Sequence, residues 1–195
     1  MLSGVCHRLA ALLSGPTPEA IAITSRRRLT MPMRLEGSCS CGAVRFTVDS
    51  HTPVPYQRCY CSICRKQQGG EGYAINIGAI ADTLKVSGED HLGLYRAVIH
   101  DEERPSPEVS TGERRFCREC GSALWLYDPT WPDLVHPFAS AIDSDLPKPP
   151  SRVHMMLSSR ARWVEPAIGP DDQCFEDYPE DALEDWHRAR GLWVD

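Results

Sequence analysis

The cysteines of this chain are grouped in a way that favours metal binding. Seven of the nine fall into three short clusters, which are Cys39 and Cys41, then Cys59, Cys61 and Cys64, and finally Cys117 and Cys120. Zinc prefers four tetrahedral donors, and C-x-C and C-x-x-C steps let one bend of backbone offer two sulfurs to one ion. A closed structural site uses four thiolates, and the remaining three suit a catalytic zinc with one open position. The count therefore predicts two zinc ions, one structural and one catalytic.

Other chemistries of clustered cysteines have weaker support. Disulfides would require an oxidising compartment, and the N-terminus carries no persuasive secretory signal. Iron also binds such clusters, so the sequence alone does not exclude an iron site. Zinc storage or redox sensing by exposed thiolates is a third alternative, and no further feature supports it. Cys6 and Cys174 stand alone and are interpreted as ordinary residues without a ligand role.

The spacing of the clusters also suggests how seven sulfurs divide between two ions. Alternation along a strand would put Cys39 and Cys41 on one face, where both could bind one ion. Cys117 and Cys120, followed by a glycine that relieves a tight turn, form a metal knuckle that supplies two more ligands. The middle cluster already holds three sulfurs in one loop. We therefore predict that this cluster is the open site.

The elements that would position these cysteines are mostly strands. Alternating β-branched and aromatic residues predict the strands 43–48, 72–77, 84–86, 94–96 and 123–127. Charge and two prolines make 101–107 an exposed loop, and the prolines between 128 and 150 argue against long helices and central strands there. Only 182–190 has a helical pattern. The chain is therefore predicted to be mainly β, a compact zinc-containing β-sheet domain with little helix.

Length and charge narrow the class of protein. A chain of 195 residues with 42% apolar content is enough for one core. The formal net charge is -6, and seven thiolates holding two Zn²⁺ ions would bring it to about -9, which argues against a nucleic-acid partner. No stretch approaches the roughly 18 apolar residues that span a bilayer, so no membrane association is expected. The oligomeric state is left open.

The first 33 residues differ in composition from the rest. They contain Arg8, Arg26, Arg27 and Arg28 but only one acidic residue, Glu19. This bias is similar to that of a mitochondrial transit peptide. The favoured interpretation is a disordered extension, or a start at Met31 or Met33. We therefore expect a cytoplasmic protein, with a mitochondrial location as the alternative.

Three ordered motifs carry a resemblance to a known family. They are G-S-C-S-C-G-A-V-R-F, C-Y-C-S-I-C-R-K-Q-Q-G-G and F-C-R-E-C-G-S-A-L-W. The stretch from 34 to 165 resembles the glutathione-dependent formaldehyde-activating enzyme (GFA) family, also called the centromere-protein-V/GFA domain. The chain departs from the family at Gln67, Gln68, Gly69 and Gly70, where relatives often carry a small or hydroxyl residue before the glycine.

The resemblance implies a fold, two metal sites and an activity. It implies a mainly β domain at 34–165, preceded by the extension 1–33 and followed by a C-terminal segment, 166–195, that packs on it. It places a structural zinc on Cys39, Cys41, Cys117 and Cys120, and a catalytic zinc on Cys59, Cys61 and Cys64. The implied activity is that of a carbon–sulfur lyase, with glutathione as a possible thiol. These ligand sets agree with the partition argued from spacing.

The middle site suits chemistry on a small thiol. A thiol bound at the open position of such a zinc would ionise near neutral pH and could attack formaldehyde or a related electrophile, while the reverse step cleaves carbon–sulfur. Arg58, Arg65 and Lys66 flank the site and could attract a carboxylate-bearing thiol, or they are solvated surface charges. His136 or Asp143 could assist proton transfer, although a structural role is favoured for both.

Two functional hypotheses follow. The first is a zinc-dependent carbon–sulfur lyase that acts on a small thiol adduct, with glutathione plus formaldehyde or a related electrophile as the candidate pair. The alternative is a non-enzymatic zinc-stabilised binding module, in which the second ion only staples the sheet. A fourth protein ligand at the middle site would favour the module, and an open position would favour the enzyme.

Overall fold

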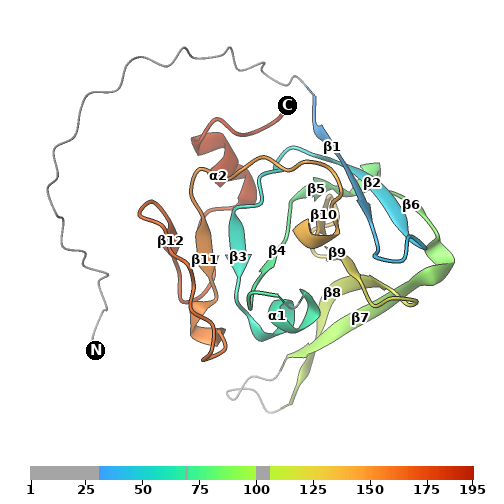
Figure 1. Cartoon of the computed structure of the whole chain (residues 1–195), viewed down its shortest axis with the longest axis horizontal. Helices are drawn as coiled ribbons and strands as arrows, with labels where there is room; N and C mark the ends of the chain where they lie inside the picture. The colour runs from blue at the N-terminus through green and yellow to red at the C-terminus, as the bar shows by residue number, and fades with distance from the viewer. Residues whose placement is uncertain (1–30, 69, 100–105) are drawn as a thin grey trace, which may run out of the picture.

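A computed structural model describes residues 31–68, 70–99 and 106–195, and these ranges confirm a mainly β architecture. They contain three sheets and two α-helices, which are α1 (Ser62–Gln68) and α2 (Leu183–Ala189) (Figure 1). Four single turns of 3₁₀ helix lie at Ala81–Thr83, Glu89–His91, Ala139–Ala141 and Leu157–Ser159. The interpretations of residues 1–30, including Cys6, of Gly69 and of the loop at 101–105 fall outside the described residues.

The first two sheets enclose the main core. One has the order β1 (Met33–Ser38), β2 (Arg45–Ser50), β6 (Lys85–Ser87), all antiparallel. The other has the order β5 (Ala79–Ile80), β10 (Leu134–Pro137), β9 (Ala123–Tyr127), β8 (Glu108–Cys117), β7 (Leu92–Ile99). Phe46 of β2 packs edge-on against Trp125 of β9, with 5.2 Å between ring centroids. The two sheets are thus joined by buried aromatic and aliphatic side chains.

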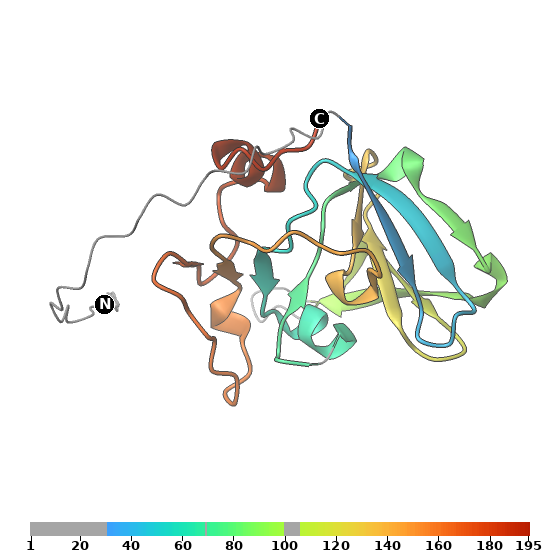
Figure 2. The ribbon, with the colours of Figure 1, turned by 45° about the horizontal axis from the view of Figure 1, so that its top comes forward.

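The third sheet brings the C-terminal segment against the domain. Its order is β12 (Gln173–Cys174), β11 (Val153–Met155), β3 (Gln57–Cys59), β4 (Ala74–Ile75), and β11 runs parallel to both of its neighbours. Trp186 of α2 is buried and stacks on Tyr56, with ring centroids 3.6 Å apart. This sheet and α2 lie on one side of the molecule, away from β1, β2 and β6 (Figure 2).

Two expectations about the elements are wrong. A helical pattern was expected only at 182–190, yet α1 begins within the middle cysteine cluster and carries Cys64. Central strands were not expected between 128 and 150, yet β10 lies between β5 and β9. Its proline, Pro137, comes at the last position of the strand, where a missing N–H interrupts little of the ladder. In the described residues, neither helix is long and apolar enough to cross a membrane.

His187 of α2 makes the attachment of the C-terminal segment sensitive to pH. The side chain is fully buried; its Nδ1–H donates to the Leu183 carbonyl at 2.7 Å, and Nε2 accepts the Val54 N–H at 3.2 Å. Burial lowers the pKa of His187, so the folded chain keeps it neutral while the unfolded chain protonates it near pH 6.5. Its contribution to stability is therefore complete above pH 6.5 and is lost as the pH falls.

We expect the free energy of unfolding to fall below pH 6.5, by up to about 1.4 kcal/mol per pH unit for this group. In His187→Gln the amide oxygen can still accept the Val54 N–H but does not titrate in this range. The variant should be less stable at pH 7.5 and should show a smaller slope between pH 6.5 and 5.5. Urea unfolding at each pH, with zinc content measured in parallel, tests this. An unchanged slope in the variant would contradict it.

Candidate metal centres

The first and third cysteine clusters converge to form what we call the four-cysteine site, Cys39, Cys41, Cys117 and Cys120. Their sulfur atoms all lie within 4.8 Å of one another. The Sγ of Cys41 is 3.5 Å from that of Cys39 and 3.8 Å from that of Cys117. Sulfurs about 2.3 Å from a tetrahedral zinc lie about 3.8 Å apart, whereas a disulfide needs about 2.05 Å. The donor set therefore fits a zinc ion, and the disulfide alternative is wrong for this site.

Each pair of the four-cysteine site lies in a turn that ends in a glycine. Gly42 donates its N–H to the Cys39 carbonyl at 3.0 Å, and Gly121 donates to the Cys117 carbonyl at 2.8 Å. The φ angles of the two glycines are 75° and 76°, which other residues disfavour. The expectation that Cys39 and Cys41 share one face of a strand is wrong, because β1 ends before them. A turn, not strand alternation, brings the two sulfurs together.

The middle cluster, Cys59, Cys61 and Cys64, forms the three-cysteine site at the turn between β3 and α1. Its sulfurs also lie within 4.8 Å of one another. Cys59 and Cys64 are buried, and Cys61 is half-buried. Hydrogen bonds from the Cys59 and Cys64 thiols, against burial, lower the pKa of Cys61 to about 2, while the neighbouring sulfurs and burial raise the pKa of Cys59. Three thiolates this close need a cation to be charged together, and a divalent metal supplies one.

The three-cysteine site has three protein donors and no fourth in residues 31–68, 70–99 and 106–195. Among the described residues, no other histidine, cysteine or carboxylate places a ligand atom within the same 4.8 Å group. A zinc bound here would therefore keep one tetrahedral position for a group that does not belong to the protein. This is the arrangement that distinguishes an exchangeable metal site from a closed structural one.

A cavity of about 390 Å³ lies against the three sulfurs. Its volume is within the range of small-ligand sites. Besides the cysteines, its polar lining comes from separate parts of the chain and comprises Gln57, Asn76, Ser110, Arg114, His136, Tyr178 and Asp181. The open side of the metal site thus faces a space large enough for a small molecule.

Three neighbouring strands supply one row of this lining. Arg114 of β8 pairs with Leu126 of β9, which in turn pairs with His136 of β10. Side chains at paired positions lie on the same face of a sheet, so all three line the cavity. His136 is half-buried, and burial lowers its pKa, which keeps the imidazole neutral near pH 7.

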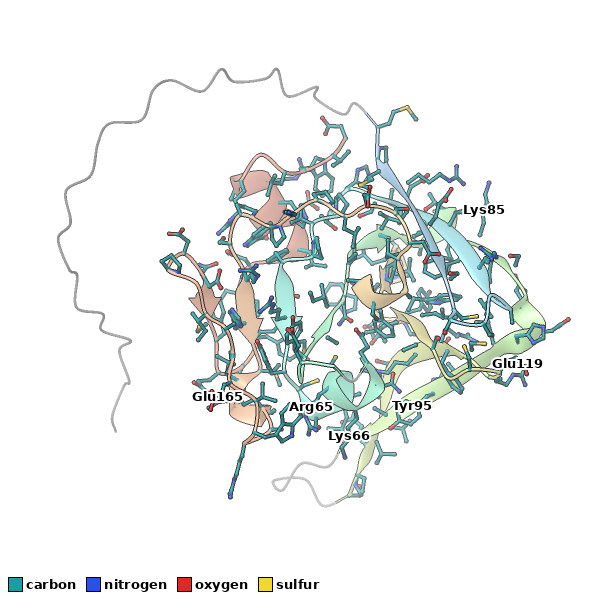
Figure 3. The ribbon with its side chains drawn as sticks, viewed as in Figure 1. Arg65, Lys66, Lys85, Tyr95, Glu119 and Glu165 are labelled. Atoms are coloured by element: carbon teal, nitrogen blue, oxygen red, sulfur yellow. The ribbon has the colours of Figure 1, made fainter. Side chains whose placement is uncertain are left out.

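The charged residues next to the cysteines in sequence lie elsewhere. Arg65 and Lys66 are on α1, at the lower edge of the molecule in Figure 3, and neither lines the cavity. Lys66 borders a separate groove beside Tyr95, and Arg58 stacks over the ring of Tyr73, 4.6 Å from its centroid. The exposed side chain of Asp143 is also outside the cavity lining. Of the residues expected to attract the substrate or assist proton transfer, only His136 lines the cavity.

A row of hydrogen bonds between buried side chains, which the sequence did not indicate, lies beside the three-cysteine site. Tyr60, between two of the cysteines, bonds through its hydroxyl to Nδ1 of His154 at 2.9 Å. Nε2 of His154 lies 3.2 Å from Oδ2 of Asp172, whose side chain is 3% exposed. Backbone N–H groups of Gly169 and Arg152, against the effect of burial, hold the pKa of Asp172 below its usual range. These hydrogen bonds hold Tyr60, and with it the backbone between Cys59 and Cys61, in place.

The fold and the two cysteine sites define a mainly β domain with one closed and one open site of metal-binding geometry. A family profile described as glutathione-dependent formaldehyde-activating enzyme (GFA) matches residues 34–156. The chain belongs to this family, as its motifs indicated.

Two comparisons with known proteins accompany this assignment. A Halomonas elongata protein, provisionally named a glutathione-dependent formaldehyde-activating enzyme, is 56% identical over 160 residues, which cover 82% of this chain and 98% of the relative. A crystal structure of a Rhodobacter sphaeroides protein matches 59% of this chain and 92% of its own, at 27% identity and a TM-score of 0.43.

We expect a mutation in one cysteine site to remove the ion of that site alone. We expect two zinc ions per chain in the parent and one in a folded Cys61→Ser variant. Cys39→Ser should lose the ion that joins β1 to β8, and its melting temperature should drop by about 10 °C or more. Zinc analysis and thermal unfolding measure both effects. Cys174→Ser, which alters an exposed cysteine outside both sites, is the control and should keep two ions. Loss of both ions from Cys61→Ser would contradict independent sites.

Proposed function

We propose that this chain is a zinc-dependent carbon–sulfur lyase acting on a small thiol adduct, with glutathione and formaldehyde as the first pair to test. The observation that carries the proposal is the three-cysteine site, which has no fourth protein donor among the described residues and faces a cavity. In this proposal Cys59, Cys61 and Cys64 hold the reactive zinc. The structural zinc belongs to Cys39, Cys41, Cys117 and Cys120. The name of the Halomonas relative supports glutathione as the thiol.

The reaction divides into bond making and proton transfer. Zinc, when bound, would lower the pKa of a thiol that takes the open position. In one direction the thiol sulfur bonds to the aldehyde carbon, the C=O electron pair moves to oxygen, and that oxygen gains the proton that the thiol lost. The reverse direction breaks the carbon–sulfur bond and restores thiol and aldehyde.

The cavity residues would position the reactants and move the proton. His136 is neutral near pH 7, so it can accept the thiol proton and return it to the aldehyde oxygen. The half-buried Leu126 and buried Met155 make part of the wall apolar, which limits water near the reacting atoms. Thiolate chemistry fits a reducing compartment, so we place the protein in the cytoplasm, with the mitochondrion as the alternative.

Catalysis can be tested by the exchange of ¹³C label between formaldehyde and its glutathione adduct, followed by NMR. The parent should exceed the uncatalysed exchange rate. Cys61→Ser should return it to that rate, and His136→Gln should lower the enzymatic part by about 10²-fold while keeping two zincs and glutathione binding. Lys66→Gln, a change outside the cavity on α1, is the matched control and should be unaffected.

The same experiment separates the enzyme from the binding module. A parent that holds two zincs but neither binds glutathione nor speeds the exchange would favour the module. A Cys61→Ser variant that keeps the parent rate would exclude the three-cysteine site as the reactive centre.

A further inference from the structure

Arg114 is a buried cation that forms no ion pair with a carboxylate of the described residues. It is 9% exposed and lines the cavity above the three-cysteine site. Within the part of the chain that the structure describes, its one hydrogen bond is a long one, from Nη1 to the Gly112 carbonyl at 3.3 Å. Among the described residues, no carboxylate lies within ion-pair distance of it, and none of its nitrogens is both sealed from solvent and unpartnered. Its remaining N–H donors therefore open onto the cavity.

The neighbouring cations of the same sheet are paired. Arg115, the next residue of β8, forms an ion pair with Glu113 at 2.8 Å, and Arg96 of β7 pairs with the same carboxylate. These side chains lie on the opposite face of the strand from Arg114, as alternation requires. The face of β8 that carries Arg115, on the same side as the core residue Trp125, thus has a counter-ion in Glu113. Among the described residues the cavity lining holds one carboxylate, Asp181, and it is not within ion-pair distance of Arg114.

The strand also leaves room around the guanidinium. A Cβ at Gly112 would lie 3.0 Å from Leu126 Cδ1 and 3.3 Å from Nη1 of Arg114. A larger residue at this position would therefore crowd the arginine and its strand partner. Ser110, on the same face, extends the polar side of the cavity.

Within the protein the charge could also offset the thiolates or a neighbouring carboxylate. The Cys59 and Cys61 thiols and burial have larger effects on the pKa of Cys64 than the guanidinium, which lowers that pKa through its charge alone. Asp128 also senses the Arg114 charge, but its oxygens already accept hydrogen bonds from Thr111 and Thr130. Neither the Cys64 thiol nor the Asp128 carboxylate accepts a hydrogen bond from the Arg114 guanidinium.

We propose that Arg114 anchors a carboxylate of the substrate, so that this site selects thiols bearing a carboxylate over neutral thiols. The inference rests on the proposed function, since it takes the substrate sulfur to be bound at the three-cysteine site. Guanidinium and carboxylate match in a two-point hydrogen bond, which fixes the orientation of a ligand as well as its charge. In a chain of net charge -6, an acidic thiol needs such a local cation to enter. A neutral thiol would leave the buried guanidinium unpaired.

The test compares two thiols that differ only in this group, 3-mercaptopropionate and its neutral amide, 3-mercaptopropionamide. Binding to the zinc-loaded full chain is measured by calorimetry for the parent, Arg114→Gln, Arg114→Lys and the control Arg115→Gln, with zinc content for each. The parent and Arg115→Gln should bind the acid about 30-fold more tightly than the amide. Arg114→Gln should lose the preference with amide binding unchanged, and Arg114→Lys should keep part of it.

The possible failures are distinguishable. If the parent binds both thiols equally, the anchor is wrong while the thiol site stands, and this result does not depend on how any variant folds. If Arg114→Gln weakens acid and amide alike, or loses zinc, the arginine acts through the metal site and the proposal is overturned. If the parent holds two zincs and binds neither thiol, the proposed function fails and the anchor fails with it.

Discussion

Repulsion between closely spaced thiolates is the constraint on which the rest of this structure depends. Seven sulfurs are gathered into two groups, each within 4.8 Å, in a chain that is already negatively charged. Neither group can be fully ionised without a cation. The four-cysteine site joins the end of β1 to the end of β8, and the three-cysteine site joins β3 to α1. Metal binding and folding are therefore coupled at both places.

A single strand connects the two sites. Cys117, the last residue of β8, belongs to the four-cysteine site, and Arg114, three residues earlier, lines the cavity of the other site. The register of β8 shifts on either side of Arg114, against β7 between Arg96 and Val98 and against β9 between Arg115 and Phe116. The closed site thus fixes one end of the strand whose side chains shape the open site. The four-cysteine site therefore bears on the geometry of the cavity although it lies outside it.

The sequence predicted the grouping of the cysteines better than the surroundings of the two groups, for a physical reason. C-x-C and C-x-x-C spacings act over a few residues, so the grouping of sulfurs is a local property. The cavity is not local: Arg114, His136 and Tyr178 come from strands and a C-terminal segment that only the tertiary fold brings together. β8 was missed because one of its faces carries Ser110, Gly112 and Arg114 toward a cavity instead of apolar residues toward a core, so its alternation is weak. Arg65 and Lys66 follow the cysteines directly in sequence, but on α1 neither side chain lines the cavity.

Among the described residues, hydrogen bonds in the frame around the three-cysteine site help to keep a fourth protein donor away from the sulfurs. His136 is the histidine of the cavity lining, yet its imidazole lies outside the 4.8 Å group of sulfurs. It is held in register by β9 on one side of β10 and β5 on the other. The cysteines are fixed as well. Tyr60 bonds to the buried His154, which in turn bonds to Asp172, and this holds the backbone between Cys59 and Cys61. Moving β10 out of its sheet, or Tyr60 away from its partner, is one way to bring His136 to the sulfurs. Either change would break buried hydrogen bonds, so a small ligand is the less costly way to fill the fourth position.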